Sequence, residues 1–192
     1  GNFLPSPKKT FNPMMLMAIV ILVPGTQFAA NFIANLTGYI RPDWLQQYNE
    51  LFETSGITDT TFVTVLYSVI LAPICEELIF RGVTMRCARK ALPFALANLM
   101  QAALFGLFHL NWIQGIYAFA LGIVLGYVCE CGGSIYYSMG LHMLFNLWGT
   151  LSGFFPDPGN SVVVFVVVIV VTIVSLVVGF VPVSYTHLRA HE

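Results

Sequence analysis

Six runs of mostly apolar residues divide this chain of 192 residues and leave only short segments between them. A transmembrane helix needs roughly 20 consecutive apolar residues, and most of these runs reach about that length. Only 9% of the residues are charged, whereas a soluble domain carries about 25%. The sequence therefore predicts an all-α, polytopic membrane helical bundle of about six transmembrane helices. The runs are 12–33, 60–85, 93–109, 112–128, 134–154 and 161–181.

Basic residues set the expected orientation. Lys8 and Lys9 precede the first run, and Arg86, Arg89 and Lys90 follow the second. The positive-inside rule places these five of the eight Lys and Arg in the cytoplasm. We expect a multi-pass protein of the bacterial cytoplasmic membrane with its N-terminus in the cytoplasm. The formal net charge of −1 indicates no nucleic-acid partner, and the apolar runs make the lipid bilayer the expected surroundings.

The segment between the first two runs contains an apolar stripe with helical spacing. Its members are Trp44, Leu45, Tyr48, Leu51 and Phe52. Such a stripe favours a short helix that lies on the membrane surface. A packing cap over the bundle and a gate for substrate are both compatible with this pattern.

Three charged residues interrupt the second apolar run, where each costs roughly 2.5–3.5 kcal/mol to insert. Glu77 and Arg81 are four residues apart, so they share a helix face and can form an ion pair. Glu76 is turned about 100° away on the helix and is left to point elsewhere. Pro73 removes one backbone hydrogen bond and predicts a bend beside the glutamates. A purely structural cluster of charges is the alternative.

Two further polar pairs fall on later runs, each with a spacing of four residues. Phe105 can pack beside His109, and His142 lies one turn from Asn146. A single histidine within a membrane is usually a packing residue, but two histidines with an amide and an extra glutamate favour hydrolysis. A desolvated carboxylate is a better base near neutral pH, and it can activate a water with the help of a histidine. A second histidine and an asparagine can stabilise the oxyanion.

These motifs, in this order, resemble those of the CPBP (Abi) family. That family includes the type II CAAX prenyl proteases and the bacteriocin-processing or lysostaphin-resistance-like proteins. The resemblance covers about residues 60–154. The three motifs are Glu76-Glu77-x-x-x-Arg81, Phe105-x-x-x-His109 and His142-x-x-x-Asn146.

The resemblance implies an intramembrane glutamic-type endopeptidase that needs no cofactor. Glu76 and His109 would activate water, and His142 and Asn146 would form the oxyanion hole. The substrate would be a peptide or protein in or at the membrane, such as a prenylated CAAX-type or bacteriocin-like chain. The family has up to eight membrane spans. Residues expected to support the site are Glu77, Arg81 and Phe105.

Three alternatives remain at this stage. In a zinc-dependent protease Glu76, His109 and His142 would bind the metal, although the sequence has no HExxH motif. A scaffold or bacteriocin-immunity protein could keep the same fold without turnover. A transporter would also place ionisable residues within the membrane, but it would more typically show a repeat in its two halves.

Three further expectations concern domain limits and helix packing. We expect one protease domain over residues 1–183, with its catalytic core at about 60–154. Residues 184–192 resemble a translated sequencing adaptor, so we expect a non-native tail, and the glycine at position 1 suggests missing upstream sequence. Gly122 and Gly126 form a GxxxG motif, which predicts close helix contact inside the bundle rather than a dimer interface. The valine-rich run 161–181 is expected to face lipid.

Overall fold

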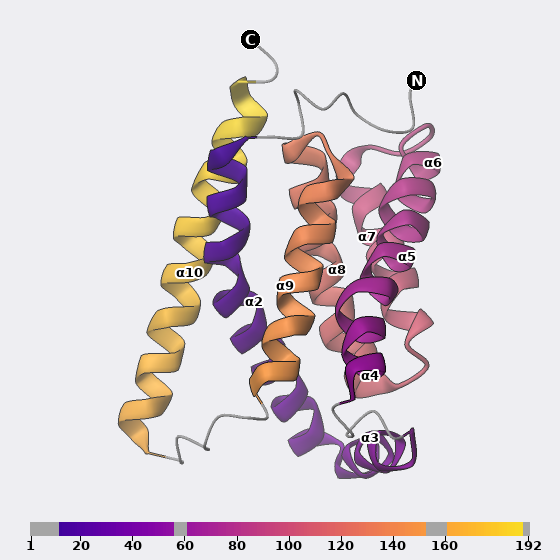
Figure 1. Cartoon of the computed structure of the whole chain (residues 1–192), viewed down its shortest axis with the longest axis vertical. Helices are drawn as coiled ribbons and strands as arrows, with labels where there is room; N and C mark the ends of the chain where they lie inside the picture. Colours follow the sequence, from indigo (N-terminus) through magenta and orange to yellow (C-terminus); the bar gives the residue numbers. More distant parts are fainter. Residues whose placement is uncertain (1–11, 56–60, 153–160, 190–192) are drawn as a thin grey trace. The chain divides into compact units, whose positions relative to one another are not determined.

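The computed structural model describes residues 12–55, 61–152 and 161–189 (Figure 1). Helices account for nearly all of these residues, and no strand occurs among them. The predicted all-α fold is therefore confirmed. The separate helices are α2 (Pro13–Ile40), α3 (Pro42–Ser55), α7 (Phe94–Phe108), α8 (Trp112–Gly132), α9 (Ile135–Ser152) and α10 (Val162–Arg189), and residues 62–88 form a further continuous helix between α3 and α7.

Four helices in the described ranges are long and apolar enough to cross a membrane. The other two expected spans differ, because α7 has only 15 residues and α9 carries several polar side chains along its 18 residues. These are the helices associated with the predicted histidines, so the departure from ideal spans coincides with the candidate site. The four are Pro13–Ile40, Phe62–Ala88, Trp112–Gly132 and Val162–Thr186.

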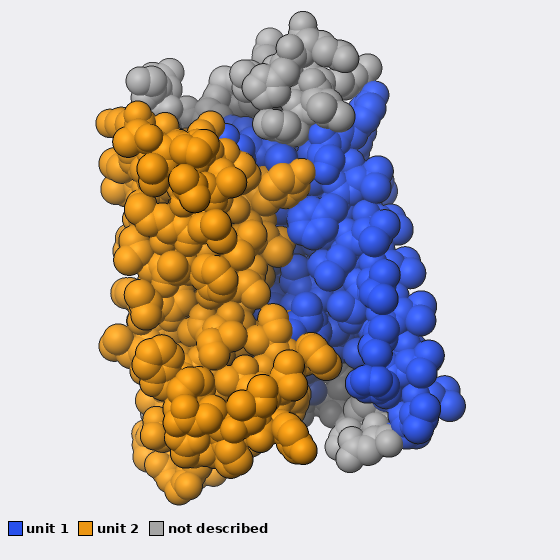
Figure 2. Space-filling model, turned by 180° about the vertical axis from the view of Figure 1, so that it is seen from behind, with its two compact units in different colours: residues 1–29, 128–192 blue, residues 30–127 orange. Residues whose placement is uncertain are grey.

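The chain forms two compact units, which Figure 2 colours separately. Unit 1 contains residues 1–29 and 128–192, and unit 2 contains residues 30–127. The prediction of one protease domain over 1–183 and a non-native tail over 184–192 stays a prediction. The last helix, α10, extends to Arg189.

Within unit 1, a serine of α10 forms hydrogen bonds with backbone groups of α2 beside Pro24. The Ser175 hydroxyl accepts a hydrogen bond from the Gly25 N–H at 2.8 Å and donates one to the Ile21 carbonyl. Membrane helices tolerate proline where a neighbouring helix satisfies the freed backbone groups in this way. The expectation that run 161–181 only faces lipid is therefore incomplete: most of its valines are exposed, but Ser175 is buried against α2.

Within unit 2, α7 and α8 approach closely at glycines. A Cβ added at Gly122 would lie 3.1 Å from Ala102 of α7, and one at Gly126 would overlap Asn98 Oδ1. At the other end of the contact, a Cβ at Gly106 would lie 2.5 Å from the Gly115 carbonyl oxygen. Small residues let helix backbones approach in a membrane. The prediction that the GxxxG motif makes a close helix contact is confirmed.

We expect Gly106→Ala to destabilise the protein by about 1–3 kcal/mol. The added methyl group would press on the backbone of α8, which cannot rotate away as a side chain could. The melting temperature of the detergent-solubilised protein should fall by about 2–4 °C per kcal/mol. Gly149→Ala in α9 is the control, because the nearest atom to its added Cβ would be Nε2 of Gln27 in α2, at 3.9 Å. Equal melting temperatures for the two variants would contradict the close contact.

The surface stripe on α3 packs against the start of α8. The Trp44 ring stacks on Trp112 with centroids 5.4 Å apart, and the Arg41 guanidinium lies 4.2 Å from the Trp44 ring. One turn further, Tyr48 hydrogen-bonds Tyr117, which packs against the core of unit 2. These contacts favour the packing-cap interpretation of α3. The side chain of Phe52 lies outside the described part of the chain.

Candidate active site

The predicted catalytic glutamates lie on a helix that changes its winding on either side of them. Residues Ala72–Glu77 are α-helical, and π-helical turns directly precede and follow them. Pro73 has no N–H to donate, and the backbone N–H of Ala72 bonds to the Tyr67 carbonyl five residues back. Such π-helical insertions often occur at functional sites. The successive segments are α4 (Phe62–Leu66), η1 (Tyr67–Leu71), α5 (Ala72–Glu77), η2 (Leu78–Met85) and α6 (Arg86–Ala88).

The predicted ion pair between Glu77 and Arg81 is confirmed. Arg81 Nη1 donates to Glu77 Oε1 at 2.8 Å, and both side chains are 0% exposed. Two buried charges cost several kcal/mol each in desolvation, which only close pairing and further hydrogen bonds can offset. The pair is therefore held tightly in unit 2 and is unsuited to exchanging protons with a substrate.

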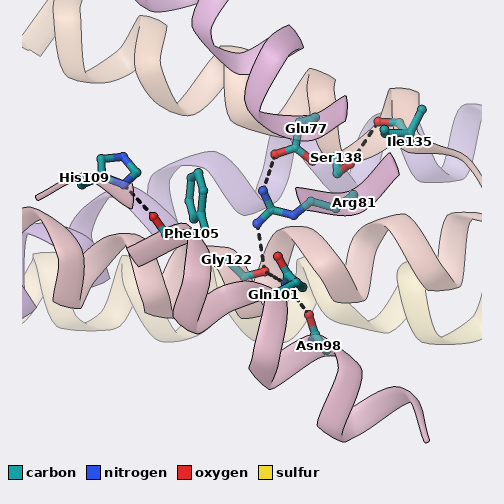
Figure 3. A network of polar contacts seen from close by, with 9 residues as sticks. All are labelled: Glu77, Arg81, Asn98, Gln101, Phe105, His109, Gly122, Ile135 and Ser138. Atoms are coloured by element: carbon teal, nitrogen blue, oxygen red, sulfur yellow. Dashed lines mark hydrogen bonds and ion pairs between the residues drawn. The ribbon is translucent and has the colours of Figure 1, made fainter. Parts of the chain in front are cut away.

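Arg81 makes two further contacts that fix its orientation (Figure 3). Its Nη2 donates to the Gly122 carbonyl of α8 at 3.1 Å. Its guanidinium carbon lies 4.6 Å from the centre of the Phe105 ring, which is a favourable cation–π distance. Arg81 thus connects η2 to both α7 and α8.

Phe105 in turn positions His109. The two rings meet edge to face with centroids 4.9 Å apart, and His109 Nδ1 lies 2.8 Å from the Phe105 carbonyl oxygen. Because a carbonyl oxygen only accepts hydrogen bonds, Nδ1 carries the proton in this arrangement. The neutral imidazole then presents Nε2 as its proton acceptor. The predicted packing of Phe105 beside His109 is confirmed, and the tautomer suits a base.

Glu76 differs from its neighbour in exposure. It is half-buried, whereas Glu77 is completely buried in the ion pair. This difference agrees with the expected rotation of about 100° between adjacent residues on a helix. The two carboxylates therefore have separate environments, and Glu76 is the more exposed of the two.

The predicted oxyanion residues lie on α9 in unit 1. His142 is buried and Asn146 is half-buried, one helical turn further along. The Thr150 hydroxyl donates to the Asn146 carbonyl at 2.9 Å. Glu76 and His109 belong to unit 2. The joint site of all four residues stays a prediction.

Two amides that sequence analysis did not single out complete the polar network of unit 2 (Figure 3). Gln101 Nε2 donates to the Gly122 carbonyl at 2.9 Å and to Asn98 Oδ1 at 2.7 Å. Asn98 Nδ2 donates to the Ile123 carbonyl at 3.0 Å. The available signal was their position: both are polar residues in the apolar run 93–109, and Gln101 lies one turn before Phe105.

Comparison with known proteins bears on the whole of this region. Residues 58–148 match a family model described as type II CAAX prenyl endopeptidase, Rce1-like. This segment, a little under half of the chain, is similar to the Rce1-like family. All seven predicted site residues lie within the Rce1-like segment, which confirms the resemblance to type II CAAX prenyl endopeptidases. No curated protein and no solved structure matches the chain. At the level of the family, this match supports an intramembrane CAAX-type protease.

The Rce1-like segment also contains an apolar pocket of about 520 Å³ between α7 and α8. Its lining residues Leu107 and Leu110 flank His109 in the sequence, and the side chain of Leu110 is 94% exposed. Leu110 has a φ of 53°, a left-handed conformation that costs a residue with a Cβ roughly 1–2 kcal/mol. The other lining residues include Ala103, Gly106, Trp112 and Phe119.

A metal site was one of the alternatives for this region. Within either unit, the described residues contain no group of three or more His, Cys, Asp or Glu side chains that could share a metal ion. The proposed zinc ligands come from both units, with Glu76 and His109 in one and His142 in the other. Metal dependence therefore stays a question for experiment.

Proposed function

We propose that the protein is an intramembrane endopeptidase in which Glu76 and His109 activate a water molecule. The observation that carries this proposal is the division between the two adjacent glutamates. Glu77 is committed to Arg81 in a buried ion pair, whereas Glu76 is half-buried. A catalytic base must reach water and keep a carboxylate that can accept a proton. A half-buried carboxylate outside the ion pair fits this role better than the fully buried Glu77.

In the proposed reaction Glu76 takes one proton from the water. His109 orients this water through Nε2, while its Nδ1 stays bonded to the Phe105 carbonyl. The resulting hydroxide attacks the carbonyl carbon of the peptide bond, and His142 and Asn146 donate hydrogen bonds to the oxyanion. When the tetrahedral intermediate collapses, the C–N bond breaks and the leaving amine takes the proton from Glu76. The step consumes one water molecule per bond.

We further propose that the substrate carries an apolar anchor. The pocket between α7 and α8 has an almost entirely apolar lining. Its lining residues Leu107 and Leu110 flank His109 in the sequence, so a hydrocarbon chain could bind there while the peptide bond lies near the base. A prenylated CAAX-type protein fits this description, and a hydrophobic bacteriocin-like peptide is the second candidate. The proposed setting is the bacterial cytoplasmic membrane, with the N-terminus in the cytoplasm.

New protein termini provide the test. Wild type and Glu76→Gln would be expressed at equal levels in a host that lacks related proteases, and mass spectrometry would identify the termini in each membrane fraction. We expect a set of termini that occurs only with wild type, and this set would also identify the substrates. Identical sets would favour a non-proteolytic scaffold or immunity protein with the same fold.

A further inference from the structure

The carbonyl of Gly122 in α8 binds side chains from two other parts of the chain. Arg81 Nη2 of η2 lies 3.1 Å from this oxygen, and Gln101 Nε2 of α7 lies 2.9 Å from it (Figure 3). All three residues belong to unit 2. Because the helix holds this carbonyl in place, its two hydrogen bonds restrict the positions of both donor side chains.

The glycines of the GxxxG motif make this arrangement possible. Gln101 Nε2 lies only 2.8 Å from the position that a Cβ of Gly126 would occupy, and Asn98 Oδ1 fills the same space. Any larger side chain there would exclude the two amides. The motif therefore does more than bring two helices together: it exposes the α8 backbone to polar side chains of its neighbours.

The position of Arg81 matters because several predicted site residues depend on it. Its other nitrogen holds Glu77, the residue next to Glu76, and its guanidinium lies against the Phe105 ring. The carbonyl of Phe105 fixes His109. A shift of the guanidinium would thus disturb the surroundings of both groups proposed to activate water.

The buried side chain of Gln101 does not make the greatest possible contribution to the stability of the fold. Its side chain is completely buried, and its Oε1 has no hydrogen-bond partner among the described residues. A buried polar atom without a partner destabilises the folded state, so Oε1 offsets part of what the two hydrogen bonds of Nε2 contribute. The contribution of Gln101 lies in its amide nitrogen.

We propose that Gln101 is a positioning residue of the active site: it holds the Gly122 carbonyl together with Arg81 and so fixes the guanidinium between Glu77 and Phe105. The proposal rests on the proposed function for its effect on catalysis. Its geometric part, the coupling between Gln101 and Arg81, can be measured without any protease activity.

A double-mutant cycle in melting temperature tests the coupling. Gln101→Met removes one donor, and Arg81→Lys keeps a cation for Glu77 but provides no second nitrogen for Gly122. Each single variant leaves the carbonyl one side-chain donor, and the double variant leaves it none. We expect the double variant to melt about 2–4 °C below the sum of the two single effects. Gln27→Met, a second buried glutamine that lies on α2 in unit 1, should combine additively with Arg81→Lys. Additivity in both cycles would overturn the proposal.

The catalytic part is tested on an internally quenched, farnesylated CAAX peptide in proteoliposomes. We expect Gln101→Met to lower kcat about 10-fold with an unchanged KM, because a misplaced catalytic group slows the chemical step more than it weakens binding. Its melting temperature should change by less than about 3 °C, and Gln27→Met should keep the wild-type kcat. A wild-type kcat for Gln101→Met would overturn the positioning role. If wild type itself cleaves nothing while the coupling persists, the proposed function fails and the geometric assignment of Gln101 stands.

Discussion

Glu76→Gln is expected to cleave a farnesylated CAAX peptide about 10²–10⁴-fold more slowly than wild type in proteoliposomes. Glutamine has the shape of glutamate but cannot accept the proton of the attacking water. Because Glu76 is half-buried and lies outside the Glu77–Arg81 ion pair, the substitution should lower the melting temperature less than Glu77→Gln does. The measurement is the initial rate of the purified protein, together with a thermal melt of the same preparation.

Glu77→Gln is the matched control, since it makes the same change one residue further along. It leaves Arg81 as a buried cation without its carboxylate, so we expect a clear fall in melting temperature. If Glu77→Gln abolished cleavage at unchanged stability while Glu76→Gln stayed active, the two assigned roles would be reversed.

Adding 1,10-phenanthroline to wild type distinguishes the zinc-dependent alternative, in which Glu76, His109 and His142 would bind the ion and chelation would stop cleavage.

The features that sequence analysis predicted correctly are those that helix periodicity determines. The Glu77–Arg81 pair and the contact between Phe105 and His109 each join residues four apart on one helix. Their geometry follows from 3.6 residues per turn, whatever the rest of the protein does. The adjacent glutamates had to diverge for the same reason, and Glu76 is indeed more exposed than Glu77.

Helix periodicity does not predict contacts between different helices. Nothing in the spacing along the chain indicates that Gln101 and Arg81 meet at the carbonyl of Gly122, because the three residues come from different helices. Ser175 likewise bonds to the backbone around Gly25, 150 residues earlier. Such pairs depend on which helices are neighbours, which one sequence does not specify.

Two of the six predicted spans fall short of an ideal membrane helix for a related reason. Hydropathy counts apolar residues without regard to what the polar ones among them do. In α9, Ser138 and His142 are buried and Asn146 is half-buried, so this helix is shaped for interior contacts as much as for lipid. Polar residues at membrane depth face the protein interior and mark functional regions. The lower hydropathy of α9 therefore itself indicates where the site lies.

The second large effect is expected at the buried ion pair. Arg81→Met should destabilise the protein by about 3–5 kcal/mol, because it leaves Glu77 as a charge in a fully buried position. It also removes a donor from the Gly122 carbonyl and the cation from the face of Phe105. The measurement is thermal or denaturant unfolding of the solubilised protein, or the yield of folded protein where the variant is too unstable to purify.

Two comparisons separate the charge from the packing in this prediction. Removing both charges with Glu77→Leu and Arg81→Met should recover much of the lost stability, since replacing a buried pair by apolar residues is often neutral. Asp43→Asn breaks an exposed pair, in which the hydrogen bond from Arg41 lowers the pKa of the Asp43 carboxyl. Water already solvates both partners there, so unfolding should not change measurably. If the double variant were as unstable as Arg81→Met alone, the loss would come from the guanidinium contacts at Gly122 and Phe105 rather than from the uncompensated carboxylate.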